Sequence, residues 1–248
     1  MKEIDVIKEY HTRIQKVWEN TKEKSEFKEI CKLKAFAQDY LNKGGLLFLG
    51  VGASNGNKLG KDGIPLKDTC IEKDSIQYET DRGRIGENGK KGHDYYKPMI
   101  KLADKTGFGT NWSNIDITLF RETSQKKLVP FFKKFPEIMK EQLDLAIDMI
   151  IATDPEIIIV SNALVRDVLK NDSKKSRINS SGFDFHFDHN INGIGTDIIT
   201  TPVELKGRPV FFTSMLSGAG TLDKGSFKRL KWHIKYVINK LNIKIRNT

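Results

Sequence analysis

Two distant segments of the chain share one pattern, an apolar run that leads into a loop of small residues. The first is residues 46–56, LLFLGVGASNG, and the second is residues 209–220, PVFFTSMLSGAG. Short all-apolar runs are typical of strands buried on both faces of a parallel sheet. In an open α/β sheet the loops at the carboxyl ends of the strands line the ligand crevice, and small residues there let a backbone or a flat ring approach closely.

The order of apolar runs and helical patterns predicts an α/β fold, a three-layer α/β/α sandwich with a four-stranded, mainly parallel sheet. The expected strands are 46–51, 115–120, 157–160 and 210–213. The expected helices are 3–19, 26–42, one capped by Asp94 and ending near 105, 136–152, one capped by Ser161 and ending near 170, and 223–242. Alternation over 183–189 predicts an exposed strand that pairs with 198–201 as a hairpin. We expect a single domain over residues 1–248, in which residues 1–25 form an N-terminal helical extension.

Charge is concentrated at one end of the chain. The formal net charge is +10, and residues 201–248 hold ten Lys or Arg against two Asp or Glu. Such a segment indicates a polyanionic partner, with a solvated lysine-rich surface as the alternative. Two cysteines make no disulfide framework, and no run approaches the length of a membrane span. These features predict a cytoplasmic monomer that binds DNA, or else RNA or a nucleotide, and no membrane.

Two apparent motifs are excluded by their spacing. The glycine-rich loop has no Gly-Lys-Ser/Thr for a phosphate loop, and Asn55 stands where a dinucleotide fingerprint needs its third glycine. His186, Asp188 and His189 resemble a metal cluster, but in a strand His189 would point to the opposite face from the other two. We therefore predict no metal ligands and no cofactor.

The order of the motifs resembles that of the uracil-DNA glycosylase superfamily over roughly residues 27–245. A helical N-terminus leads to an apolar strand with a Gly-rich loop, and a later strand ends in Asp-x-x-x-x-Arg, which is Asp116 to Arg121. The segment PEIIIVSNA follows at 155–163, and the last strand runs into a Ser-rich loop and a basic helix. The resemblance implies that the protein flips a base out of DNA and hydrolyses its glycosidic bond, without metal or organic cofactor.

The resemblance, together with the positions of polar and aromatic residues along the chain, assigns roles to residues. Asn55, with Ser54 beside it, would orient the attacking water, and Asp116 would read the base, with Asn114 as the alternative on the same strand. Tyr95 in the crevice is a candidate for stacking on the base, or else packs at the start of a helix. The remaining residues that would line the base are Gly50, Gly52 and Ala53. The candidates for phosphate contacts are Arg121, Ser214, Ser217, Gly218, Lys224, Ser226, Lys228 and Arg229. Asp116 could instead be a buried carboxylate paired with Arg121, and Arg121 could pair with Glu122.

Three departures from the family pattern affect the chemistry. Gly52 stands where the family has Asn or Asp, Ala53 stands where it has Pro, and the loop 213–217 lacks the histidine that stabilises charge on the leaving base. The sequence thus predicts a fold that is kept while the uracil chemistry is altered or lost. The alternatives are a catalytically inactive nucleic-acid-binding module on this fold, and an α/β enzyme acting on a nucleotide or small phosphorylated substrate.

Overall fold

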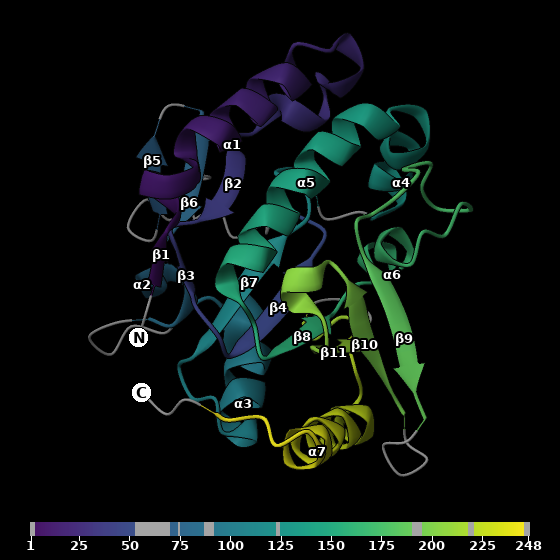
Figure 1. Ribbon diagram of the computed structural model, residues 1–248. Helices are drawn as coiled ribbons and strands as arrows, with labels where there is room; N and C mark the ends of the chain where they lie inside the picture. The colour runs from purple at the N-terminus through teal and green to yellow at the C-terminus, as the bar shows by residue number, and fades with distance from the viewer. Residues whose placement is uncertain are drawn as a thin grey trace.

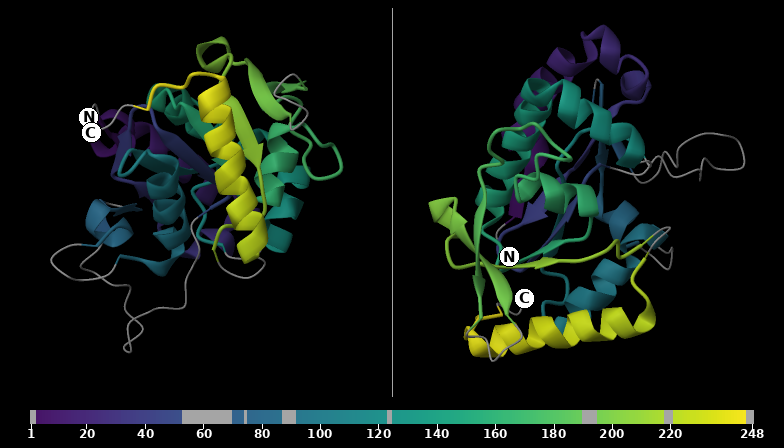
Figure 2. Two further views of the ribbon diagram at one scale, coloured as in Figure 1. Left: turned by 90° about the horizontal axis from the view of Figure 1, so that it is seen from below. Right: turned by 90° about the vertical axis from the view of Figure 1, so that its right-hand side faces the viewer.

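In the computed structural model the chain forms a six-stranded central sheet with helices on both faces (Figure 1 and Figure 2). The structure describes residues 3–52, 70–73, 75–86, 92–122, 125–189, 195–217 and 221–245. The strands lie in the order β7, β4, β8, β11, β10, β9. Their bounds are β4 Leu46–Gly50, β7 Trp112–Asp116, β8 Ile157–Val160, β9 Asp184–Asp188, β10 Thr196–Thr201 and β11 Pro209–Phe212.

The first four strands of this order are parallel, as the apolar runs predict. β4 is hydrogen-bonded to β7 on one side and to β8 on the other, and all five of its residues are buried. The strand expected at 115–120 lies earlier, because the chain turns toward α5 (Pro136–Thr153) after Asp116. There the Leu119 N–H donates to the Gln142 side chain of α5 (2.9 Å) rather than to a strand.

The expectation of four strands is wrong, because the predicted hairpin joins the main sheet. β10 pairs antiparallel with β9 and also with β11, where Asp197 lies opposite Val210. Alternating residues reveal a hairpin, but they do not reveal which strand it will pair with. The short turn η5 (Val203–Leu205) brings the chain back from β10 directly alongside β11.

Helices cover the two faces of the sheet, and the alternation within β4 shows why. Leu47 and Leu49 belong to one apolar core, and Leu46 and Phe48 belong to another. The first core is closed by α1 (Val6–Lys22), α4 (Gln125–Lys134), α5 and α6 (Ala163–Leu169), and the second by α3 (Lys97–Thr106) and α7 (Lys224–Lys240). No helix among the described residues is both long and apolar enough to cross a membrane.

The expected helix at 26–42 is also wrong. That segment forms two short 3-10 turns, η1 Ser25–Phe27 and η2 Ile30–Lys32, and then the strands β2 Ala35–Gln38 and β3 Tyr40–Asn42. β2 pairs with β6 Ile76–Glu79, which pairs with β5 Cys70–Lys73, and β3 pairs with β1 Glu3–Asp5. Long-range pairing overrides a local helical pattern here. The short elements α2 Asp81–Arg84 and η4 Asp94–Tyr96 follow β6, and His93, rather than Asp94, caps η4.

The N-terminal helix is part of the core rather than an appended extension. Ile14 and Trp18 of α1 are almost fully buried, and the Trp18 ring lies 6.1 Å from the ring of Phe120. α1 also packs along α5. The first helix therefore contributes to the stability of the whole sheet.

We expect Trp18→Ala to lower the free energy of unfolding by about 3–5 kcal/mol, because the substitution leaves a large cavity in the main core. The matched control is Trp232→Ala, since Trp232 is 52% exposed and Trp18 only 2%. The control should change stability by no more than about 0.5 kcal/mol. Urea denaturation of both variants measures the difference, and equal small effects would contradict the integral role of α1.

Candidate functional site

The carboxyl ends of the four parallel strands meet at one edge of the sheet, called here the carboxyl edge. Gly50 of β4 lies opposite Asp116 of β7 in the ladder. On the other side of β4, the N–H of Ser161 after β8 donates to Leu49 O (3.2 Å), and the N–H of Thr213 after β11 donates to Val160 O (2.9 Å). The loops that follow β4 and β11 therefore begin at the same edge, on either side of β8.

Gly50, Tyr95 and Asp116 meet at this edge and form what is called here the Asp116 cluster. A Cβ atom on Gly50 would overlap the Asp116 Oδ1 atom and would lie 3.7 Å from the Tyr95 hydroxyl. Only glycine allows β4 to approach the carboxyl group this closely. At Gly52 a Cβ atom would lie 2.6 Å from Phe120 O and 2.9 Å from Thr118 Oγ1. The predicted glycines thus serve close packing against the segment that follows β7.

Asp116 carries an unusual carboxyl group. Its Oδ1 atom is fully buried and has no hydrogen-bond partner among the described residues, although the residue as a whole is partly exposed. Burial, together with the smaller effect of the negative charge of Glu79, raises the pKa of Asp116 to about 7. The acid and the carboxylate are therefore both present near neutral pH, and the site can either donate or accept a hydrogen bond.

Arg121 does not pair with Asp116 or Glu122. Its Nη1 donates to the side chain of Gln77, and its guanidinium lies 5.3 Å from the centre of the Phe36 ring. Arg121 is half-buried and its Nε atom is fully buried without a partner among the described residues. It supports the small sheet from this position, which makes it a poor ligand for a phosphate on the surface.

A chain of buried hydrogen bonds fixes the two tyrosines of η4. Arg84 Nη1 donates to Gln38 Oε1 (2.6 Å), and Gln38 Nε2 donates to the Tyr96 hydroxyl (3.3 Å). The Tyr96 hydroxyl donates to Glu79 Oε2 (3.0 Å). Burial raises the pKa of Glu79, while the bond from Tyr96 and the charge of Arg84 oppose that rise. Tyr95, the neighbour of Tyr96, is held against Gly50 and Asp116 as a result.

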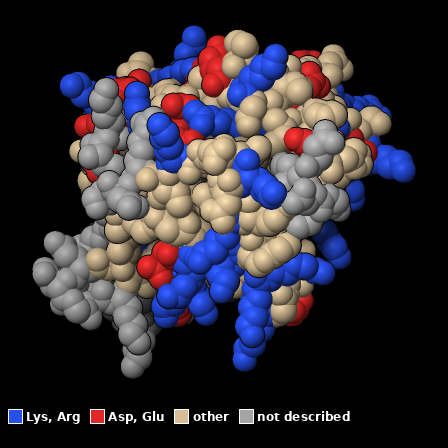
Figure 3. All heavy atoms as spheres, turned by 60° about the horizontal axis from the view of Figure 1, so that its bottom comes forward, with Lys and Arg blue, Asp and Glu red and all other residues tan. Residues whose placement is uncertain are grey.

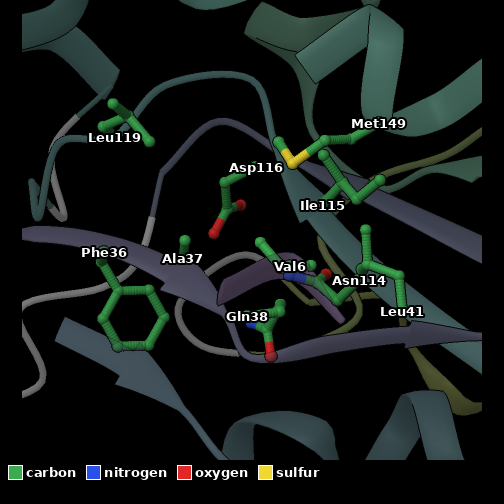
Figure 4. Close-up of a pocket in the computed structure, with 10 residues that line it drawn as sticks. All are labelled: Val6, Phe36, Ala37, Gln38, Leu41, Asn114, Ile115, Asp116, Leu119 and Met149. Carbon is green, nitrogen blue, oxygen red and sulfur yellow. The ribbon is translucent and has the colours of Figure 1, made fainter. Parts of the chain in front are cut away.

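Asp116 also borders a small cavity between β2 and β7, shown in Figure 4. Its volume is about 20 Å³, the size of one water molecule and far too small for a base. Gln38 and Asn114 line it with Asp116, and both polar side-chain atoms of Asn114 are buried without a partner among the described residues. Asn114, which is 1% exposed, therefore faces the interior of the protein.

A second, larger hollow lies beside the loop after β11 and is called here the α7 groove. It has a volume of about 580 Å³ and is lined by residues of α6, β10, β11, α7 and the 213–214 loop, including Arg166, Ser214, Ser226, Arg229 and His233. The N–H of Leu222 donates to Met215 O (3.0 Å), which ties the loop to the start of α7. Ser214 and Arg229, both exposed, are thus brought together as predicted, whereas Ser217 is buried and its Oγ atom lacks a partner among the described residues.

The N-terminus of α7 is already capped by a carboxylate. Asp223 Oδ1 accepts from the N–H groups of Gly225 (2.7 Å) and Ser226 (3.0 Å), and Asp223 Oδ2 accepts from Ser226 Oγ (2.6 Å). These bonds lower the pKa of Asp223, with the side-chain bond from Ser226 the largest cause. The expected phosphate contact at Ser226 is therefore disfavoured by a negative charge at the same helix end.

The exposed side of α7 is strongly basic and is called here the α7 surface. The helix contains no Asp or Glu. No ion pair between α7 and an acidic side chain occurs among the described residues. Figure 3, which brings this side toward the viewer, shows Lys and Arg side chains gathered on it. The cations are Lys224, Lys228, Arg229, Lys231, Lys235 and Lys240.

Some expected site residues lie outside the described residues, namely Ala53, Ser54, Asn55 and Gly218. The sequence pattern gave no indication of the buried chain of Gln38, Glu79 and Arg84. Gln38 falls in the segment expected to be a helix, and Glu79 and Arg84 fall between the expected elements. Within the parts of the chain that are described, no three His, Cys, Asp or Glu side chains gather as a metal site would require.

Comparison of the chain with protein-family models, with curated proteins and with solved structures gives no match.

We expect Asp116→Asn to flatten part of the pH dependence of stability. A carboxyl whose pKa is raised from 3.8 to about 7 stabilises the fold fully below pH 4, and this contribution is lost as the pH rises to 7. At pH 8 the free energy of unfolding of the variant should exceed that of the wild type by about 2 kcal/mol. This is well below what the whole pKa shift would give at 1.36 kcal/mol for each pKa unit. Urea denaturation at pH 5 and pH 8 measures this, with the exposed Asp184→Asn as the control.

A stability difference between Asp116→Asn and the wild type that is the same at both pH values would show that Asp116 is ionised throughout, and would contradict the buried, neutral acid.

Proposed function

We propose that the protein is a uracil-DNA glycosylase-like DNA-binding protein that receives one flipped base at the carboxyl edge and hydrolyses the N-glycosidic bond of a damaged or modified base. One observation carries this proposal. A helix with six cations and no acid borders the α7 groove, which is also lined by Thr213 and Ser214 of the loop that begins at the carboxyl edge, and that edge holds a buried carboxyl group with a pKa near 7. The combination supplies a backbone-binding surface and a base-reading group on one side of the molecule.

The α7 surface suits a polyanion because its charges are not neutralised by described acidic neighbours. Lys228 and Arg229 are exposed, and Arg229 also lines the groove beside Ser214. A protein that neutralises phosphates with such side chains releases condensed counterions, so its affinity falls steeply with salt. This electrostatic contribution supplies affinity for DNA of any base sequence, so specificity for one base needs a different group.

Asp116 is the group that supports base selection. An ionised carboxylate accepts hydrogen bonds from an exocyclic amino group such as that of cytosine, whereas a protonated acid can donate to a carbonyl oxygen. The amide that reads uracil in the family offers a hydrogen-bond donor and a hydrogen-bond acceptor in fixed positions at every pH. An Asp with a pKa near 7 changes its preference within the physiological range. Tyr95, held beside it, supplies a ring against which a base can stack.

The departures in the two loops support slow chemistry on ordinary uracil. Gly52 has no side chain with which to position a water, and the segment from Thr213 to Ser217 has no histidine. Losing one preorganised group of this kind costs about 100- to 1000-fold in rate. Two missing groups therefore favour a modified base with a better leaving group, or an activity that depends on Asn55.

We expect the double substitution of Lys228 and Arg229 by Ala to weaken duplex DNA binding and to flatten its salt dependence. Each lost phosphate contact lowers the slope of log K against log salt by about one unit, so the double variant should lose about two. Titration of a labelled duplex at several salt concentrations measures both quantities.

The control is the double substitution of Lys133 and Lys134, which removes the same charge from exposed positions on α4, on the other face of the sheet. If both pairs reduce the slope equally, the α7 surface has no special part in binding, and if neither does, the cations only solvate the protein.

We expect weak or no release of uracil from U·G and U·A duplexes. Where a substrate base is found among modified duplexes, its release should change with an apparent pKa near 7 that Asp116→Asn abolishes. Release of labelled base between pH 5.5 and pH 8.5 tests this. Asn55→Ala should abolish activity while DNA binding persists. Rapid uracil release that both variants retain would place the reaction elsewhere on the protein.

The same assays separate the other two functions. Salt-dependent duplex binding without release of any base would indicate an inactive nucleic-acid-binding module. Absence of duplex binding, with a nucleotide protecting the protein from thermal unfolding, would indicate an enzyme acting on a small phosphorylated substrate.

A further inference from the structure

The outer side of α7 carries an exposed aromatic stack among its cations. Trp232 is 52% exposed, whereas most large apolar side chains of the described chain are buried. Its ring stacks on that of Tyr236, with centroids 5.5 Å apart and planes 25° from parallel. Tyr236 packs against the core beneath α7, so it holds the tryptophan ring in one orientation.

The cations of the helix surround this stack. Lys240 Nζ lies 5.7 Å from the centre of the Tyr236 ring. Lys228 is one helical turn before Trp232, and Lys235 is three residues after it, so both lie on the same side of the helix. With no acid in α7, the stack stands in a positive environment.

We propose that Trp232 and Tyr236 form a stacking platform for an unpaired base of single-stranded nucleic acid, distinct from the Asp116 cluster. Base stacking on an aromatic ring does not depend on the base sequence, because every base presents a flat face. The flanking cations would hold the nucleic-acid backbone. A protein partner would need an apolar or acidic surface of its own, whereas nucleic acid supplies rings and negative charge together. The proposal rests on the proposed function only in that nucleic acid is the ligand.

The position of the platform suggests its use. Arg229 lies one turn before Trp232 and lines the α7 groove. A strand whose backbone follows the groove could therefore continue along α7 and place a base on Trp232. The platform would add affinity for DNA with unpaired nucleotides near the base that is read, without contributing to the choice of that base.

Tryptophan fluorescence tests the platform directly. The chain has three tryptophans, and Trp18 and Trp112 are only 2% and 5% exposed. Titration with a short single-stranded oligothymidylate should quench the emission of Trp232. Trp232→Ala should weaken binding at least fivefold and remove the quenching, while Trp232→Phe should stay within about twofold of the wild type. Leu241→Ala, which removes another exposed apolar side chain next to α7, should leave binding unchanged.

The outcomes distinguish this platform from the proposed function. Unchanged single-strand affinity in Trp232→Ala, with duplex binding still weakened by the Lys228 and Arg229 substitutions, overturns the platform alone. Absence of any nucleic-acid binding by the wild type overturns both. An equal loss of single-strand and duplex affinity in Trp232→Ala also overturns the platform, because stacking on an unpaired base should not contribute to binding an intact duplex.

Discussion

The geometry of the carboxyl edge depends on β4, a strand buried along its whole length and paired on both sides. Its parallel ladder to β7 sets Gly50 opposite Asp116, and its ladder to β8 sets Val160 and the loop after it at the same edge. Because β8 pairs in turn with β11, the register of β4 also determines where the loop at 213–217 begins. A slip of one residue in β4 would exchange its two apolar faces between the two cores, so the register is strongly specified.

The price of the Asp116 cluster is a set of buried polar atoms that are incompletely satisfied. Tyr96, Glu79 and Gln38 satisfy one another, but Asp116 Oδ1 and the Asn114 amide have no partner among the described residues. An unmade hydrogen bond of this kind costs about 1–3 kcal/mol. The fold tolerates it because a neutral Asp116 avoids the larger cost of a buried charge. Such local instability is typical of sites that bind a ligand.

The sequence predicted the parts of the fold that depend on local pattern. The apolar runs of β4, β8 and β11 and the periodicities of α5 and α7 lie close to their expected bounds. It failed where pairing between distant segments decides the structure. Ala35–Gln38 has a helical pattern, yet it forms a strand because β6 is available to it. Long sequence separation also concealed the hydrogen bond from Arg84 to Gln38 and the one from Tyr96 of η4 to Glu79. Asp116 was singled out from the family resemblance and its place in the expected strand 115–120. Its unpaired oxygen was not predicted, because it depends on the tertiary packing of Gly50 and on Arg121 bonding to Gln77 instead.

The α7 surface and the Asp116 cluster respond to different conditions. The α7 cations are exposed, so salt screens them over about 8–10 Å and weakens whatever they bind. Asp116 is buried, so salt acts on it little, and proton concentration controls whether it donates or accepts. Burial raises the pKa of Tyr95 above its usual value, so Tyr95 stays neutral in both protonation states of Asp116. Under the proposed function, affinity for the nucleic-acid backbone and selection of the base are therefore separable, the first governed by ionic strength and the second by pH.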